Sequence, residues 1–320
     1  MVNEKDVQFF GEKCREVVAE IGKDVVGQKE VVECAVIAMI AGGNVLLEGV
    51  PGVGKTRLVR SMGRAFQLPF SRIQFTPDLM PADVTGTNII EKDADGKNKL
   101  KFQRGPIFSN IILADEINRA TPRTQSSLLE AMEERQITVD GVTSQLESPF
   151  MVMATQNPLE SFGTFPLPDA QMDRFFMRLS LGYMTREQEM SVLCRPSTVA
   201  IIDKLEQVVS AEDTAYVCKE FTNVKVSEPV LNYMMDIVER TRTEDNFVTG
   251  VSTRGAIALY KASQVTAAFA GRDFVIPEDV QLVAPHVLAH RISRDSRTTG
   301  TAIKFLNKII ENVPVPLENV

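Results

Sequence analysis

The segment GVPGVGKT, directly behind the apolar run Val45–Leu47, has the residue types of a phosphate-binding loop. The loop consists of Gly49, Val50, Pro51, Gly52, Val53, Gly54, Lys55 and Thr56. Glycines allow successive backbone N–H groups to turn toward phosphate oxygens, and a following helix directs its positive end to the same point. Lys55 would add a positive charge for the β- and γ-phosphates, and Thr56 an oxygen for Mg²⁺. The loop predicts nucleotide binding but leaves the reaction open.

Two adjacent carboxylates follow another apolar segment, in the sequence ILADE at residues 112–116. A phosphate loop needs a second group for its metal ion, so we expect Asp115 to hold Mg²⁺, directly or through water. We expect Glu116 to orient and deprotonate the attacking water. A solvated acidic turn is the alternative interpretation, but the apolar strand before the pair favours catalysis.

Three further polar residues stand where they could reach the same phosphates. Asn157 follows the next apolar segment, and a parallel strand would deliver its amide beside Asp115 and Glu116. Arg174 lies just before a fourth apolar segment, and Arg254 lies in the first turn of a predicted helix. Arginine suits developing phosphoryl charge because its guanidinium is planar and always ionised. Taken singly, the asparagine could start an Asn-Pro turn and the arginines could be surface residues.

The elements that would position these residues alternate between strands and helices in the first half of the chain. Strands are predicted near residues 44–48, 73–75, 149–155 and 175–182 and in the run that ends at Asp115; helices are predicted in two pieces over 1–43, from Thr56, and over 124–135. Hairpins are predicted near 88–103 and 136–146, the second with Asp140-Gly141 at its tip. The pattern predicts an α/β core over residues 1–183, with helices on both faces of a parallel sheet.

From about Met184 the sequence instead predicts helices. They are expected over residues 186–195, 201–210, 227–242, 252–270 and 277–290. Ser252 suits an N-cap, and Pro277 suits a first helical turn. Residues 184–320 are therefore predicted to form an α-helical second domain and a C-terminal tail.

Composition narrows the class of protein. The 320 residues are 44% hydrophobic and 24% charged, which allows a full apolar core, and the formal net charge of −7 argues against a duplex-binding protein. The cysteines at 14, 34, 194 and 218 form no CxxC pair and are expected to be small core residues in a reducing cytosol. The N-terminus has no signal-peptide pattern, and no apolar run approaches the roughly 20 residues of a membrane span. We expect a cytoplasmic protein without a membrane span.

The order of these motifs resembles the AAA+ ATPases, and more narrowly the MoxR family. DEINRATPRTQSSLLEAMEERQIT at 115–138 and GTFPLPDAQMDRF at 163–175 are similar to signatures of that family, and the resemblance covers about residues 8–295. It implies an AAA+ P-loop core with a helical lid, in which the two hairpins are the helix-2 insert and the pre-sensor hairpin. Phe165 and Asp169 depart from the usual tyrosine and glutamate, outside the catalytic set.

The resemblance also implies a role for each candidate residue. Gly49 to Thr56 would be Walker A, and Asp115 with Glu116 would be Walker B. Asn157 would be sensor 1, Arg174 the arginine finger that reaches a neighbouring subunit, and Arg254 sensor 2, which reports the γ-phosphate to the lid. Val26 and Gly27 would line the adenine pocket, and Arg119 is a second candidate for an arginine that acts in trans.

The resulting hypothesis is an ATPase that uses ATP and Mg²⁺ and works as a homo-oligomeric ring, expected to be a hexamer. Family resemblance implies chaperone-like remodelling or metal insertion with a von Willebrand factor A-domain partner. A nucleotide-dependent scaffold with little turnover is one alternative, although such a scaffold could lose Glu116, which is present here. A DNA-acting AAA+ motor is another, and the acidic charge counts against nucleic acid as a partner. A P-loop kinase would have no use for the helical lid.

Overall fold

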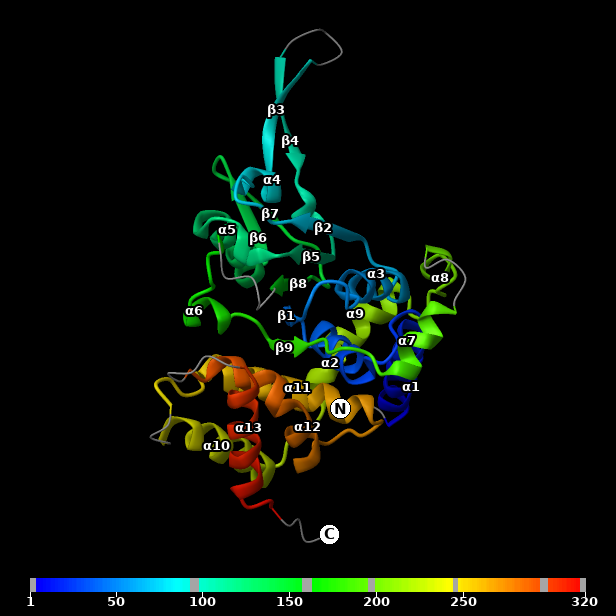
Figure 1. Cartoon of the computed structure of the whole chain (residues 1–320), viewed down its shortest axis with the longest axis vertical. Coiled ribbons are helices and arrows are strands. Elements are labelled where there is room, and N and C mark those ends of the chain that lie inside the picture. Colours follow the sequence, from blue (N-terminus) through cyan, green and yellow to red (C-terminus); the bar gives the residue numbers. More distant parts are fainter. Residues whose placement is uncertain are drawn as a thin grey trace.

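The computed structural model describes residues 4–92, 98–156, 163–194, 199–243, 247–293 and 299–316. Its centre is a five-stranded parallel sheet in the order β2-β5-β8-β1-β9 (Figure 1). The sheet strands are β1 (Val45–Glu48), β2 (Phe70–Gln74), β5 (Ile111–Asp115), β8 (Met151–Gln156) and β9 (Met177–Ser180). This confirms the predicted parallel sheet. Asn157, the sensor 1 candidate, lies outside the described residues.

Helices cover both faces of the sheet, as predicted. On one face are α1 (Glu4–Asp24), α2 (Lys29–Ile40) and α3 (Lys55–Ala65), and on the other is α5 (Pro122–Glu134), preceded by the short α4 (Pro81–Thr85). Alternation along the strands explains the two layers: Ile111 and Leu113 pack into the core on the α1–α3 side, whereas Ile112 and Ala114 pack into the core on the α5 side. Parallel strands buried on both faces need such continuous apolar runs.

Two antiparallel hairpins leave this core, both where they were predicted. The hairpin of β3 (Gly86–Lys92) and β4 (Asn98–Arg104) projects beyond the sheet (Figure 1). The hairpin of β6 (Gln136–Val139) and β7 (Val142–Gln145) turns at Asp140-Gly141, both at positive φ, as a two-residue loop requires. Asn88 Nδ2 donates a hydrogen bond to Asp140 Oδ2 at 2.6 Å, which joins the two hairpins.

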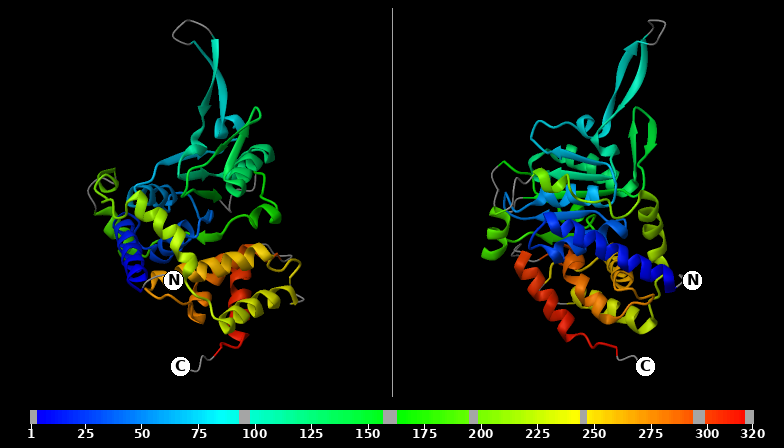
Figure 2. Two further views of the ribbon diagram at one scale, coloured as in Figure 1. Left: turned by 180° about the vertical axis from the view of Figure 1, so that it is seen from behind. Right: turned by 90° about the vertical axis from the view of Figure 1, so that its right-hand side faces the viewer.

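Of the remaining described helices, one short helix precedes β9 and the others follow it in two groups. The short α6 (Asp169–Met172) precedes β9, and α7 (Arg186–Leu193), α8 (Val199–Ile202) and α9 (Ala211–Glu220) lie beside α1–α3. The helices α10 (Glu228–Thr243), α11 (Thr253–Phe269), α12 (Pro277–Leu288) and α13 (Thr299–Asn312) pack against one another below the sheet (Figure 2). The boundary at 183/184 stays a prediction.

Four expectations for this half can be compared with the structure. The helix predicted over 201–210 is wrong: α8 ends at Ile202, and Ser210 is instead the N-cap of α9, accepting a bond from the Asp213 N–H. Ser252 does cap α11 through the Gly255 N–H, and Pro277 does open α12. Cys194 is exposed, so its expected place in the core is also wrong.

Within the described ranges, no helix is long and apolar enough to cross a membrane. A cytoplasmic location stays a prediction.

Candidate functional site

The phosphate loop connects β1 to α3 at the edge where the parallel strands end, called here the carboxyl edge of the sheet. Gly52 and Gly54 have φ values of 88° and 99°, a region that favours glycine. Gly54 is the N-cap of α3, so the helix points its free N–H groups at the loop. Lys55 Nζ donates to the Gly49 carbonyl oxygen at 2.8 Å. The loop therefore has the backbone form of an anion cradle.

The predicted acidic pair lies at the same edge, where β5 ends. Thr155 on β8 joins its two members: its Oγ1 donates to Asp115 Oδ1 at 2.7 Å and accepts the Glu116 N–H at 2.8 Å. Arg72 donates to Asp115 Oδ2 from Nε and Nη2, at 3.1 and 2.7 Å. The Asp115 side chain thus lies on the same side of the sheet as α3, whose first residues include Thr56.

The Glu116 carboxylate is held by two side chains. Gln74 Nε2 donates to its Oε2 at 3.0 Å, and Arg119 Nη1 donates to the same oxygen at 2.9 Å. Arg119, the second candidate for a trans-acting arginine, therefore pairs with Glu116 of its own chain in this structure. Sequence reasoning missed Arg72 and Gln74; they occupy alternate, polar positions of the strand predicted around Ile73, beside the acidic pair.

These groups fit a nucleoside triphosphate with a divalent cation. The loop and the α3 N-terminus supply N–H donors, Lys55 supplies a cation, and Thr56 and Asp115 supply the oxygen ligands that Mg²⁺ prefers. The strand order places β8 between β1 and β5, which confirms the adjacency that the sequence predicted for the ends of β5 and β8.

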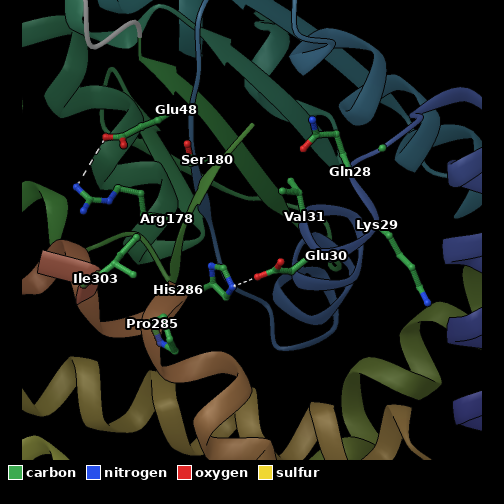
Figure 3. Close-up of a pocket in the computed structure, with 12 residues that line it drawn as sticks. Gln28, Lys29, Glu30, Val31, Glu48, Arg178, Ser180, Pro285, His286 and Ile303 are labelled. Carbon is green, nitrogen blue, oxygen red and sulfur yellow. Dashed lines mark hydrogen bonds and ion pairs between the residues drawn. The ribbon is translucent and has the colours of Figure 1, made fainter. Parts of the chain in front are cut away.

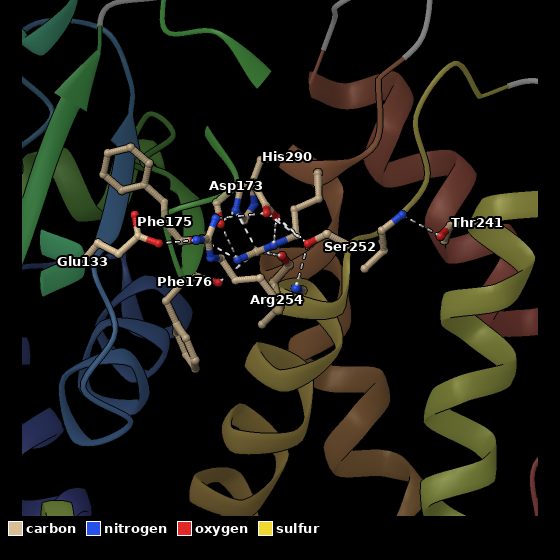
Figure 4. A network of polar contacts seen from close by, with 12 residues as sticks. Glu133, Asp173, Phe175, Phe176, Thr241, Ser252, Arg254 and His290 are labelled. Carbon is tan, nitrogen blue, oxygen red and sulfur yellow. Dashed lines mark hydrogen bonds and ion pairs between the residues drawn. The ribbon is translucent and has the colours of Figure 1, made fainter. Parts of the chain in front are cut away.

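The two candidate arginines lie elsewhere, at the amino edge of the sheet, where the strands begin. Arg174 precedes β9, and its Nη1 lies 3.2 Å from Oε2 of Glu133 near the end of α5. Arg254, in the first turn of α11, pairs with Oε1 of Glu133 and lies 3.4 Å from Asp173 Oδ2 (Figure 4). Arg135, two residues after Glu133, donates to the carbonyl oxygen of Phe150, which directly precedes β8.

This placement corrects one expectation. Strands of four to six residues, at about 3.3 Å per residue, separate the two edges by roughly 13–20 Å. Arg254 therefore lies far from the phosphate loop of its own chain, and a nucleotide there is not within its reach. Arg174 and Arg254 come together through Glu133 as one cationic pair.

A buried polar seam fixes the C-terminal helices to this edge. Arg291 Nε donates to Asp173 Oδ1 at 2.9 Å and its Nη2 donates to the Phe175 carbonyl at 2.7 Å, while Ser252 Oγ donates to Asp173 at 3.0 Å. Burial lowers the pKa of Arg291 to about 10, although Asp173 opposes that shift. Burial and the neighbouring arginine charges lower the pKa of His290 well below its usual range, so this histidine is neutral.

A cavity of about 200 Å³ lies between α2, the end of β9, and the helices α12 and α13 (Figure 3). Gly27 lines it, in the turn between α1 and α2, and a Cβ atom there would meet the Gln188 side chain of α7. Arg178 and Glu48 form an ion pair at its wall, and His286 of α12 pairs with Glu30 of α2 across it. Val26 stands next to Gly27 in the same turn but is not among the lining residues.

Comparison with known proteins agrees with this architecture. Residues 44–177 match the family described as ATPases associated with various cellular activities, and residues 239–310 match the AAA lid domain. The chain is 44% identical to the uncharacterized protein YeaC of Bacillus subtilis, over 94% of each chain, and 37% identical to the chaperone MoxR1 of Mycobacterium tuberculosis, over 94% of this chain and 82% of that protein.

It is also similar to a crystal structure of a candidate ATPase from Cytophaga hutchinsonii, with a TM-score of 0.89 and 38% identity over 98% of each chain. The parallel sheet, the phosphate loop and the C-terminal helices thus define an α/β AAA+ fold with a helical lid. Within that class, the chain belongs to the MoxR family of AAA+ ATPases.

Proposed function

We propose that this chain is a Mg²⁺-dependent ATPase whose active site is completed by a second copy of the chain in a ring. One observation carries the proposal: the phosphate loop with its acidic pair and the arginine pair lie at opposite edges of one sheet. A head-to-tail arrangement of copies would bring the arginine edge of one subunit to the phosphate loop of the next. We propose that the rotation between copies closes this arrangement into a ring, and family membership supports a hexamer.

Each residue then has a chemical task. The N–H groups of Gly49 to Thr56 and the Lys55 ammonium would bind the phosphates, and Thr56 and Asp115 would hold Mg²⁺, which shields the phosphate charge when bound. Glu116 would take a proton from the attacking water, and the sensor 1 role of Asn157 remains part of the proposal. Arg174 and Arg254 would stabilise the charge that develops on the phosphate of the neighbouring subunit. Gly27 and Val26 would lie near the adenine ring of the nucleotide.

ATP turnover tests this assignment. Glu116→Gln and Arg174→Ala should each lower kcat by at least about 10³-fold, the lower end of what a trans-acting arginine contributes in GTPases. Arg240→Ala, at an exposed position of α10, serves as the matched control and should leave kcat unchanged. Undiminished turnover in Glu116→Gln would remove the assignment of Glu116 as the base, whereas little turnover in the wild type itself would favour the scaffold alternative.

Mixed rings test the trans arrangement. Lys55→Ala subunits cannot bind the phosphates normally but retain Arg174, so adding them to Arg174→Ala subunits should restore turnover. Differently tagged variants that co-purify establish that the two proteins mix. If mixing is shown and turnover stays lost, the arginine acts within its own chain and the shared site is wrong.

For the biological task we propose chaperone-like remodelling or metal insertion, with a von Willebrand factor A-domain protein as partner. The relative named chaperone MoxR1 supports the chaperone-like role, while metal insertion and the partner follow from the family resemblance alone. A tagged Glu116→Gln variant, which would retain ATP, should co-purify with such a partner from its own cells in larger amount than Lys55→Ala does. Equal recovery with both variants would show that binding of the partner does not depend on bound ATP.

A further inference from the structure

The Glu133 carboxylate contacts one arginine of the core and one arginine of the lid. Its Oε2 atom lies 3.2 Å from Arg174 Nη1 of the core. Its Oε1 atom pairs with Arg254 Nη2 of the lid, and both of these residues are labelled in Figure 4. Each oxygen thus holds a different arginine, and each arginine uses one nitrogen for the contact. A fork-to-fork pair with a single arginine would have occupied both oxygens.

This geometry leaves both guanidinium groups available to another acceptor. The side chains of Arg174 and Arg254 are 33% and 46% exposed, so each can still offer N–H donors to solvent or to an incoming phosphate. Two neighbouring cations repel each other unless an anion lies between them. Glu133 is the anion that contacts both guanidinium groups, whereas Asp173 accepts a longer contact from Arg254 at 3.4 Å and is also bound by Ser252 and Arg291.

We propose that Glu133 is a positioning residue that holds Arg174 and Arg254 as a preformed pair for the triphosphate of the neighbouring subunit. The inference rests on the proposed function. It assigns Glu133 no contact with the nucleotide: the residue acts by fixing the spacing and direction of the two guanidinium groups. Arg254 belongs to the lid, so it reaches Glu133 only when the lid is docked on the core. The pair of Arg174 and Arg254 therefore forms only in the docked arrangement.

The test compares Glu133→Gln with Glu134→Gln, which makes the same charge change at the next, exposed residue of α5. In rings of the same size as those of the wild type, Glu133→Gln should lower kcat on the order of 10–100-fold. A displacement of catalytic groups by about 1 Å can lower a rate by that factor. KM for ATP should stay within about twofold, since the phosphate loop is untouched. Glu134→Gln should match the wild type, and Glu133→Asp, which keeps the charge, should retain more activity than Glu133→Gln.

Mixing experiments separate a positioning role from a general loss of structure. Lys55→Ala subunits retain Glu133 and both arginines, so they should restore turnover at Glu133→Gln sites. The double variant Glu133→Gln/Arg174→Ala should be no slower than Arg174→Ala, because both changes disable the same pair.

Three outcomes would overturn the inference. An unchanged kcat in Glu133→Gln would show that the arginines need no carboxylate. A loss that Lys55→Ala subunits fail to rescue, while they do rescue Arg174→Ala, would place Glu133 in the site of its own chain. If Arg174→Ala itself is not rescued, the shared active site fails and this inference fails with it.

Discussion

Glu116 has a backbone conformation that glutamate rarely adopts, with φ 58° and ψ 50° in the left-handed region. The turn holds it there: its N–H is bound to Thr155, and its carboxylate is bound to Gln74 and Arg119. Such strain costs on the order of 1–2 kcal/mol and is tolerated where a side chain must point in one direction. The side chain of Glu116, which is proposed to activate water, is thus directed by a backbone conformation that lowers the free energy of unfolding.

This strain gives a testable order of stabilities. Glu116→Gly should be more stable than Glu116→Ala by about 1 kcal/mol, because glycine adopts positive φ without a steric penalty. At Glu130, an exposed position inside helix α5, the order should reverse by a similar amount, since glycine disfavours helix interiors. Urea denaturation of the four variants measures both differences. If Glu116→Ala is as stable as Glu116→Gly, the backbone at position 116 is not strained.

At the scale of elements, Thr155 joins the ends of β5 and β8. Its buried hydroxyl serves Asp115 and the Glu116 N–H together. Thr155→Val keeps the shape but leaves both groups without this partner, so we expect a loss of about 1–3 kcal/mol in unfolding free energy together with a lower kcat. Thr155→Ser keeps the hydroxyl and is the control. Equal effects of serine and valine on kcat would assign the role to packing alone.

The sequence predicted the sheet strands and both hairpins because their signals are local. Continuous apolar runs mark strands buried on both faces, and Asp140-Gly141 marks a two-residue turn. The helix predicted over 201–210 is wrong because Ser210, with an extended backbone (φ −71°, ψ 160°), caps the helix that follows it. No separate helix was predicted over Thr299–Asn312, the stretch that forms α13.

The candidate site was predictable only where it is contiguous in sequence. The phosphate loop and the acidic pair stand in single segments, so residue order identifies them. Arg72 and Gln74 reach the acidic pair through strand pairing, and Arg254 reaches Glu133 through lid docking. Residue types alone do not state which edge of the sheet a side chain meets, which is why the position of Arg254 had to be corrected.

At the scale of the whole molecule, the seam around Arg291 unites core and lid. His290 lies inside it, where Nε2 contacts the Phe175 carbonyl and Nδ1 has no hydrogen-bond partner among the residues that the structure describes. Protonating this ring would place a second cation beside the buried Arg291. The docking of the lid, and with it the proposed arginine pair, therefore depends on His290 staying neutral.

The pH dependence of stability follows from that requirement. The pKa of His290 is lowered in the folded protein and lies near 6.5 when unfolded, so the unfolded chain binds the extra proton as pH falls below about 6.5. Stability is therefore complete above that pH and declines below it, by up to about 1.4 kcal/mol between pH 7.5 and 5.5 from this group. Urea denaturation at pH 7.5, 6.5 and 5.5 should show that His290→Gln removes this part of the decline. His286→Gln, which changes the one other histidine, should leave it in place. An identical decline in the wild type and in His290→Gln would mean that the seam tolerates a charged ring.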